Sequence, residues 1–305
     1  MNYSKLFFSI ISAILIATST NSADIKKKTT DKISSFKDGK INQISSQISE
    51  SISSFAKDHF DSMKYLDFSI DAREHLKPTF SIMSVNEIMK IDSGTIFNQI
   101  SINTHDSDET INIGFGHREL FNNNTLLLGV NTFYDHQLSE NHERVGLGYE
   151  AISSIFDLRG NYYNAISGRR TNSEGTIEQA LDGWNLRGDY HLPIDHEVNL
   201  FISAFNFENP EAASTYKEKG NKFGADAKLG NFAIETGYMN DNKDNDAWFG
   251  NIKFVVNFGT KNQSSSANDS LTLTDVSDKL YQPVKRENKI RVVKISKSGV
   301  QVSGF

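Results

Sequence analysis

Three histidines and two carboxylates are the residues of this chain best suited to acid–base chemistry. They are His117, His136, His142, Glu119 and Asp135, and Asp135 directly precedes His136. Hydrolysis requires such groups to lie within hydrogen-bond reach of one another. Consecutive strand residues point to opposite faces, so Asp135 and His136 cannot cooperate without a bulge. We therefore predict structural roles for them near the rim of the fold and no catalytic residues.

The remaining composition excludes several other kinds of chemistry. Cysteine is absent, so neither disulfides nor thiolate metal ligands are available. The sequence contains no phosphate-binding loop, no ligand-spaced metal cluster and no nucleophile constellation. No metal and no cofactor are therefore expected. The formal net charge is −6 without a concentrated basic patch, so nucleic acid is not an expected partner.

The N-terminus is typical of a signal peptide over residues 1–23. Lys5 supplies the positive region, Leu6 to Ala17 the apolar region, and a small, polar segment ends at Ala23. The apolar run is too short to cross a bilayer as a helix, which takes roughly 20 residues. No second long apolar run follows. The sequence thus predicts cleavage after Ala23 and an exported chain without a helical membrane anchor.

Residues 24–63 have the apolar spacing of a single helix. Apolar residues recur there mostly every three to five positions, which gives one apolar stripe on a polar body. Two interpretations remain open: a solvated periplasmic helix, or a helix that binds a partner or self-associates through residues 33–63. The stripe consists of Ile33, Phe36, Ile41, Ile44, Ile48, Ile52, Phe55 and Met63.

From Tyr65 onward the hydrophobic period changes to two. In the segment 182–191, Trp184, Leu186, Gly188 and Tyr190 alternate with polar or charged residues. Such alternation suits strands that have lipid on one side and water on the other. It also explains the mean hydropathy of −0.45, because only alternate residues need be apolar. Twelve segments of this kind are expected, at about 65–72, 78–91, 95–104, 109–118, 124–134, 142–152, 155–163, 182–191, 197–208, 221–229, 231–239 and 246–258.

The gaps between these segments tend to alternate between short and long. The gap at 164–181 and the gap at 209–220 are long and polar, which is expected of outer loops, while tight turns belong at the periplasmic end. A soluble β-sandwich could also alternate. The signal peptide, the even strand count and the aromatic residues near strand ends favour a barrel. The predicted fold is all-β: a 12-stranded antiparallel transmembrane β-barrel preceded by a short periplasmic helix.

Strand parity assigns two further sets of residues. Charged residues of inward parity are expected to form a mixed-charge lumen, and they are Glu150, Asp157, Arg159, Arg187, Asp189, Glu235 and Lys253. The last strand resembles the C-terminal signal that the outer-membrane insertion machinery recognises. Its residues are Trp248, Gly250, Phe254, Val256 and Phe258.

Spaced motifs between residues 112 and 193 resemble the β-domain of the inverse autotransporters of the intimin/invasin family. They include GFGHR at 114–118, LGVNTFYDH at 128–136, HERVGLGYE at 142–150 and GNYY at 160–163. The similarity extends over roughly residues 65–293. The matching residues are Gly114, Gly116, Arg118, Gly129, Asn131, Phe133, Tyr134, Asp135, Arg144, Gly146, Gly148, Glu150, Asn161, Tyr162 and Tyr163.

The resemblance implies type Ve secretion through a barrel at residues 64–259. A linker at 260–305 would re-enter the lumen and carry a C-terminal passenger to the cell surface, which in the family usually serves adhesion. Leu280 to Ile290 resembles the segment just past the pore. No Ig-like passenger follows in this sequence, so we expect a relative without a passenger, a truncated gene, or a short display tail beyond Lys285.

The predicted function is an outer-membrane translocator or display barrel, and not an enzyme. The alternatives are a small pore or structural barrel and, third, an outer-membrane hydrolase. Expected partners are outer-membrane lipid, the barrel insertion machinery and periplasmic chaperones.

Overall fold

The computed structural model describes residues 61–258, apart from 75, 106–107, 173–174, 195–196 and 210–215, together with residues 272–295 and the backbone of 301–304. The predicted signal peptide and residues 24–60 of the predicted helix lie outside the described residues. At 61–63 the structure has a turn and the first residue of a strand instead of helix. In the described part of the chain, no helix has the length and apolarity needed to span a membrane.

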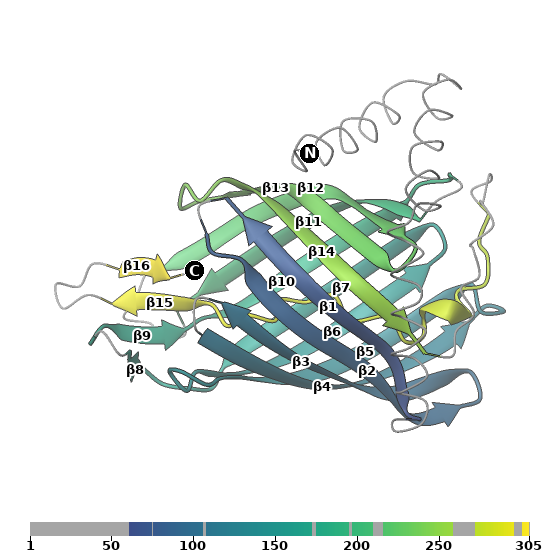
Figure 1. The fold of residues 1–305 in the computed structure, drawn as a ribbon, viewed down its shortest axis with the longest axis horizontal. Coiled ribbons are helices and arrows are strands. Elements are labelled where there is room, and N and C mark those ends of the chain that lie inside the picture. The colour runs from purple at the N-terminus through teal and green to yellow at the C-terminus, as the bar shows by residue number, and fades with distance from the viewer. Residues whose placement is uncertain are drawn as a thin grey trace, which may run out of the picture.

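Twelve antiparallel strands form a closed barrel (Figure 1). Each strand pairs with its neighbours along the chain, and β1 pairs with β14 from Tyr65 opposite Asn257 to Arg73 opposite Phe249. Closure leaves no exposed strand edge in the wall. The strands are β1 Met63–Arg73, β2 Thr79–Ile91, β3 Gly94–His105, β4 Asp108–Phe121, β5 Leu126–Gln137, β6 Glu143–Ser153, β7 Phe156–Ala165, β10 Asp182–His191, β11 Val198–Glu208, β12 Lys217–Leu229, β13 Phe232–Asp241 and β14 Ala247–Asn257.

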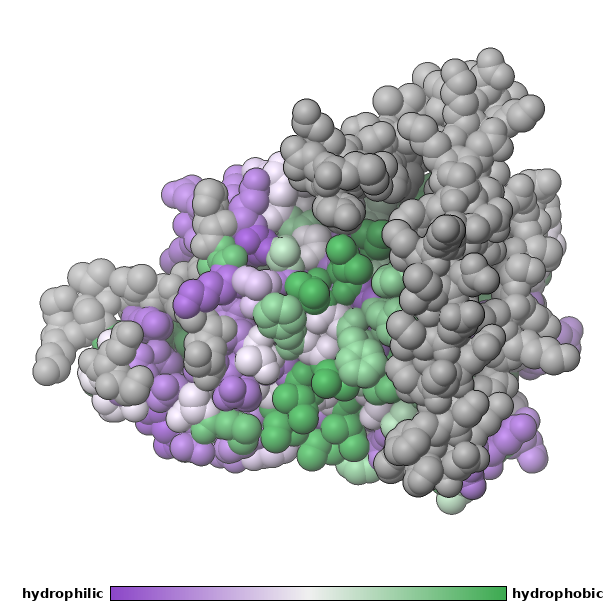
Figure 2. All heavy atoms as spheres, viewed as in Figure 1, coloured by the Kyte–Doolittle hydropathy of each residue, from purple (hydrophilic) through white to green (hydrophobic). Residues whose placement is uncertain are grey.

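The alternation in the sequence becomes an apolar outer face and a polar interior. Ile202 on β11 is 67 % exposed and Leu147 on β6 is 64 % exposed, whereas Asp189 and Arg144 are fully buried inside the barrel. Hydrophobic residues gather across the middle of the visible wall, and hydrophilic residues gather toward the left end (Figure 2). A lipid-facing band of this kind is the arrangement expected of a transmembrane barrel.

The two ends of the barrel differ in their connections. The short-turn end carries the connections at 92–93, 122–125, 154–155, 192–197 and 230–231. In the bend at 122–125, Asn122, Asn123 and Asn124 all have positive φ, a conformation that Asn tolerates better than most residues. The long-loop end carries the other connections, of which 166–181 and 209–216 are the longest. The two longest connections therefore lie at the same end, as the gap lengths predict.

A second sheet lies beside the long-loop end and was not predicted from the sequence. It consists of β8 Arg170–Thr171, β9 Ile177–Ala180, β15 Val292–Ile295 and β16 Gln301–Gly304, in the order β16-β15-β9-β8. Alternation in the sequence places these residues in the gap at 164–181 and in the segment 260–305, outside the expected strands. Their strands are short, and β9 and β15 are more than a hundred residues apart, so only tertiary pairing defines them.

Candidate functional site

The segment 274–291, which we call the linker, runs through the barrel from one end to the other (Figure 1). At the short-turn end, the amide of Val276 donates to the carbonyl of Asn124 at 2.9 Å, and Lys279 Nζ donates to the carbonyl of Ser153 at 2.7 Å. The helical turn η1, Ser277–Lys279, lies here. At the long-loop end, the amide of Leu181 donates to the carbonyl of Arg291 at 2.9 Å. The residues between them cross the lumen.

Inward side chains of the wall bind the carbonyl groups of the linker. Arg118 Nη1 donates to the carbonyls of Leu280 and Gln282 at 2.7 and 2.6 Å. Further along, Arg144 Nη2 donates to the carbonyl of Glu287 at 2.7 Å. These wall side chains satisfy carbonyl groups of the linker that would otherwise be buried without hydrogen bonds.

Other wall residues bind the amides of the linker. Gln99 Oε1 accepts from the amide of Val284 at 2.8 Å, and Tyr163 Oη accepts from the amide of Glu287 at 2.7 Å. The polar lumen thus binds the backbone of one extended segment on both its donor and its acceptor groups. The wall therefore binds the linker through specific hydrogen bonds to its backbone.

Arg286 makes the most buried charged contact between the linker and the wall. Its two terminal nitrogens donate to the two carboxylate oxygens of Asp135 at 2.8 and 2.7 Å. Asp135 also accepts from Arg144 at 2.8 Å and from Asn112 at 2.7 Å. The Arg286 guanidinium lies 4.1 Å from the ring centroid of Phe133, and its side chain is 1 % exposed. A forked, buried pair of this kind fixes both position and orientation.

The glycines of the GFG motif make room for this site. A Cβ at Gly114 would come within 2.2 Å of the Phe133 ring, and a Cβ at Gly116 within 2.3 Å of the Phe97 ring. These two rings lie under the guanidinium groups of Arg286 and Arg118, at 4.1 and 4.5 Å. The two glycines on β4 therefore leave space for the Phe133 and Phe97 rings, which pack against the two arginines.

The other motif residues divide between the two faces of the wall. A Cβ at Gly129 would meet Glu150, one at Gly146 would come 3.3 Å from Arg286, and one at Gly148 would meet both Asn131 and Asn161. Tyr163 is fully buried inside. Tyr134 and Tyr162 lie on the outer face at 38 and 53 % exposed.

The charged residues of inward parity lie inside the barrel and are linked to one another. Arg159 lies 2.8 Å from both Asp157 and Asp189, and Arg118 lies 2.6 Å from Glu150. Farther round the wall, Arg187 lies 2.8 Å from Asp189, 3.1 Å from Asp226 and 2.9 Å from Glu235.

Two lysines of the linker join this network. Lys279 lies 3.7 Å from Asp157, and Lys285 lies 2.9 Å from Asp189. The wall network therefore continues onto the linker.

A cavity of about 380 Å³ remains beside the linker. Its lining includes Lys253, Glu235 and Lys222 from the wall and Glu287 from the linker. Lys222 lies 3.9 Å from Glu287. The linker thus fills only part of the lumen.

The residues singled out for acid–base chemistry do not form a catalytic set. His117 and Glu119 lie toward the short-turn end of β4, whereas His136 lies at the long-loop end of β5. His136 stacks on Tyr134 on the outer face, while Asp135 is inside. Over residues 61–258 and 272–295, with the gaps given above, no group of three metal-binding side chains occurs.

His142 instead joins the second sheet. It is fully buried, and its Nε2 lies 3.7 Å from Glu178 on β9. Burial opposes ionisation of Glu178, but hydrogen bonds to His142 and Asn172 and the charge of Lys294 together hold the pKa of Glu178 below its usual value. Lys294 Nζ lies 3.6 Å away. His142 just before β6, Glu178 of β9 and Lys294 of β15 therefore meet in one polar cluster.

The last strand of the barrel presents apolar residues to its outer face. Trp248 is 43 % exposed, and Phe254 packs with Val256, Phe258 and Leu66 of β1. Gly250 lies opposite Ala72 in the β1–β14 pairing. Recognition of this strand by the insertion machinery stays a prediction.

The structure corrects one expectation about the linker. The family resemblance placed Leu280 to Ile290 just past the pore, and one of the three alternatives was a display tail beyond Lys285. These residues lie inside the lumen, since Arg118 binds the carbonyl of Leu280 and Asp135 binds Arg286. The chain leaves the barrel only near Arg291. The prediction was wrong because crossing length alone does not fix where the crossing begins.

Sequence reasoning also missed several inward aromatic residues. Phe201, Phe205 and Phe207 on β11 are at most 5 % exposed and point into the barrel. From its residue type alone, an apolar side chain on a barrel strand is expected to face lipid. The register provides the missing signal, because Phe205 pairs with Asn185, which has inward parity.

The described geometry is a closed barrel whose lumen binds a segment from beyond its last strand. A family model for the inverse autotransporter β-domain matches residues 15–288 of this chain. The chain belongs to this family. It is a family of membrane β-barrels and not of enzymes.

Individual relatives of this inverse autotransporter β-domain match parts of it. An attaching and effacing protein homolog of Escherichia coli (strain K12) is 31 % identical over 144 residues, covering 47 % of this chain and 48 % of that protein. The invasin of Yersinia enterocolitica is 34 % identical over 76 residues, 25 % of this chain and 9 % of that protein. The chain spans half or less of the length of these relatives.

A solved structure supports the fold alone. It comes from work on in-meso crystallization of membrane proteins, has a TM-score of 0.63 and is 17 % identical to this chain. The similarity covers 75 % of this chain and 98 % of that chain.

Proposed function

We propose that this inverse autotransporter β-domain is an outer-membrane translocator or display barrel that carries its own C-terminal segment to the cell surface. The observation that carries the proposal is the linker itself, which crosses the lumen and is bound there by wall side chains such as Arg118 and Arg144. The short-turn end would face the periplasm, because tight turns belong there in outer-membrane barrels and long loops lie outside.

An adhesion-related role at the cell surface is part of the same proposal. Its support is that relatives carry the names invasin and inverse autotransporter adhesin. The signal peptide predicted at 1–23 and the type Ve route accord with export to the outer membrane. The barrel would be inserted by the machinery that recognises β14 and the adjoining Phe258, after transport by periplasmic chaperones. Self-association through residues 33–63 is a further proposal.

The topology can be tested with single cysteines, because the chain contains none of its own. Ser303→Cys lies on β16 beyond the long-loop end, and Ser277→Cys lies in η1 at the short-turn end. A membrane-impermeant maleimide should label the first variant on intact cells and the second only after the outer membrane is permeabilised. The reverse pattern, or labelling of neither variant on intact cells, contradicts the proposal.

A small pore is the second candidate, and the cavity of about 380 Å³ beside the linker favours it. Conductance of the purified protein in planar bilayers separates the two functions. A steady conductance in the intact chain, with Ser303→Cys protected on intact cells, would favour the pore. A low conductance with surface labelling would favour display.

A further inference from the structure

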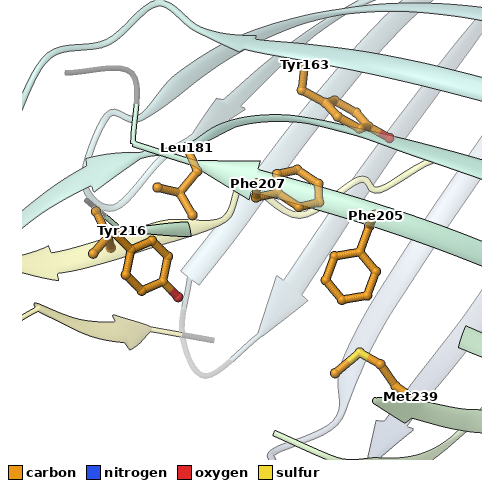
Figure 3. Close-up of a cluster of buried hydrophobic side chains, with 7 residues drawn as sticks. Tyr163, Leu181, Phe205, Phe207, Tyr216 and Met239 are labelled. Carbon is orange, nitrogen blue, oxygen red and sulfur yellow. The ribbon is translucent and has the colours of Figure 1, made fainter. Parts of the chain in front are cut away.

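An apolar cluster, which we call the collar, lies where the linker leaves the barrel (Figure 3). Its side chains come from three wall strands and from the two longest connections. Val293 of β15 belongs to the same cluster and is fully buried. The collar consists of Tyr163 on β7, Phe205 and Phe207 on β11, Met239 on β13, Leu181 between β9 and β10, and Tyr216 just before β12.

The interior contains other apolar clusters, which take Val276 and Val284 of the linker, but the collar is the cluster at the exit. Arg291, the last residue before β15, lies 4.7 and 4.5 Å from the ring centroids of Phe205 and Phe207. It also pairs with Glu218 and, at 3.0 Å, with Glu287. The collar therefore takes the apolar side chain of Val293, and Arg291 is bound at the edge of the collar.

The exiting chain also adds a strand to the β7–β10 connection. β15 pairs with β9 from Val292 opposite Ala180 to Ile295 opposite Ile177. The hydrogen bond from Leu181 to Arg291 continues this ladder to the barrel mouth. Glu178 and Lys294 face each other across it at 3.6 Å. Strand addition supplies backbone hydrogen bonds, and side-chain pockets set its register.

We propose that the β8–β9 hairpin and the collar together form a capture site for the exported segment of this same chain. The site takes β15 and β16: Val293 docks into the collar, β15 adds to β9, and β16 then folds onto β15. This site fixes the register at which the linker stops and provides a template for the first strands outside the barrel. The proposal rests on the proposed export function.

Disulfide trapping tests the register of capture. Ala180 and Val292 lie directly opposite each other. Because the neighbouring pair, Leu181 and Arg291, is hydrogen-bonded, Ala180 and Val292 form a non-hydrogen-bonded pair. Such pairs bring the Cα atoms to about 4.5 Å, within the range of a disulfide. Ala180→Cys with Val292→Cys should therefore cross-link on cells. Ala180→Cys with Val293→Cys is the matched control, because successive strand residues point to opposite faces.

We expect the in-register pair to cross-link at least tenfold more than the control, measured by mobility on non-reducing gels. Equal yields, or no cross-link in either variant, would overturn the capture site. The labelling of Ser303→Cys keeps the two proposals apart. Surface labelling without cross-linking refutes capture alone, whereas loss of labelling refutes export.

A second experiment tests the collar. Val293→Asp places a carboxylate in the apolar cluster, while Val292→Asp places it on the opposite, partly exposed face of β15. Protease added to intact cells should cleave the tail at least tenfold faster in Val293→Asp than in Val292→Asp. The heat-dependent gel shift of the folded barrel should be the same in both. Equal cleavage rates would show that the collar does not bind the tail.

Discussion

Replacing Arg286 with alanine removes the most buried charged contact between the linker and the barrel. The variant loses two hydrogen bonds to Asp135 and the stacking on Phe133 at 4.1 Å. Asp135 keeps Arg144 and Asn112 as partners, so it is not left as an isolated buried charge. The cost is therefore expected at the lower end of the roughly 3–5 kcal/mol of a fully broken buried pair.

The magnitude follows from the two contacts. Charge-assisted hydrogen bonds contribute about 2 kcal/mol and a desolvated cation–π contact about 1 kcal/mol. A loss of about 3 kcal/mol changes the equilibrium between a bound and a released linker about 100-fold. Released linker opens the lumen, so the ratio of open to closed time in planar bilayers should rise by this factor.

Lys285→Ala is the matched control for this variant. Lys285 lies next to Arg286, but its side chain is 34 % exposed, and its partners Asp189 and Asp226 both retain Arg187. Exposed pairs contribute about 0–1 kcal/mol, so the control should change the ratio by roughly fivefold or less. The reasoning is refuted if Arg286→Ala and Lys285→Ala give the same open ratio while both barrels remain folded by heat-dependent gel shift.

Three further predictions concern the lumen, the wall and the second sheet. Deletion of residues 274–305 should give a permanently open pore of larger conductance in planar bilayers; unchanged conductance would mean that the linker does not occlude it. Gly114→Ala should destabilise the barrel by about 1–3 kcal/mol in urea unfolding, because its Cβ would overlap Phe133, whereas Gly168→Ala, with no atom nearby, should not. Glu178→Gln should speed hydrogen exchange of β15 roughly threefold at neutral pH. The pKa of Glu178 is lower in the folded state than in the unfolded state, so its carboxylate stabilises the fold at pH values above the unfolded-state pKa. This stabilisation is lost as the pH falls through the folded-state pKa. A difference in exchange rate between Glu178→Gln and the unsubstituted protein that persists at low pH contradicts the prediction.

The barrel wall was predictable because its signal is local. All twelve expected segments coincide with strands to within a few residues, from 65–72 in β1 to 246–258 in β14. Each strand has lipid on one face and the lumen on the other, so the requirement for alternation is met within the strand itself. The same rule puts Asp189 and Arg159 inside, where they pair at 2.8 Å.

The contacts between distant segments were not predictable in the same way. The pairing of Arg286 with Asp135 joins positions 151 residues apart. The residues that surround each of them in the sequence do not indicate which partner it has. The inward orientation of Phe205 depends on the register between β10 and β11. Sequence-based reasoning therefore located the linker in the chain but misplaced it along the pore.

The sequence by itself determined that this chain forms a closed wall with an apolar outside and a charged inside, because side-chain alternation is written into each strand. Only the tertiary structure decided which linker residues lie in the lumen, which wall groups bind them, and that β15 pairs with β9. The physical reason is that these contacts depend on where closure of the barrel places residues far apart in the chain, and no periodicity within a segment encodes that distance.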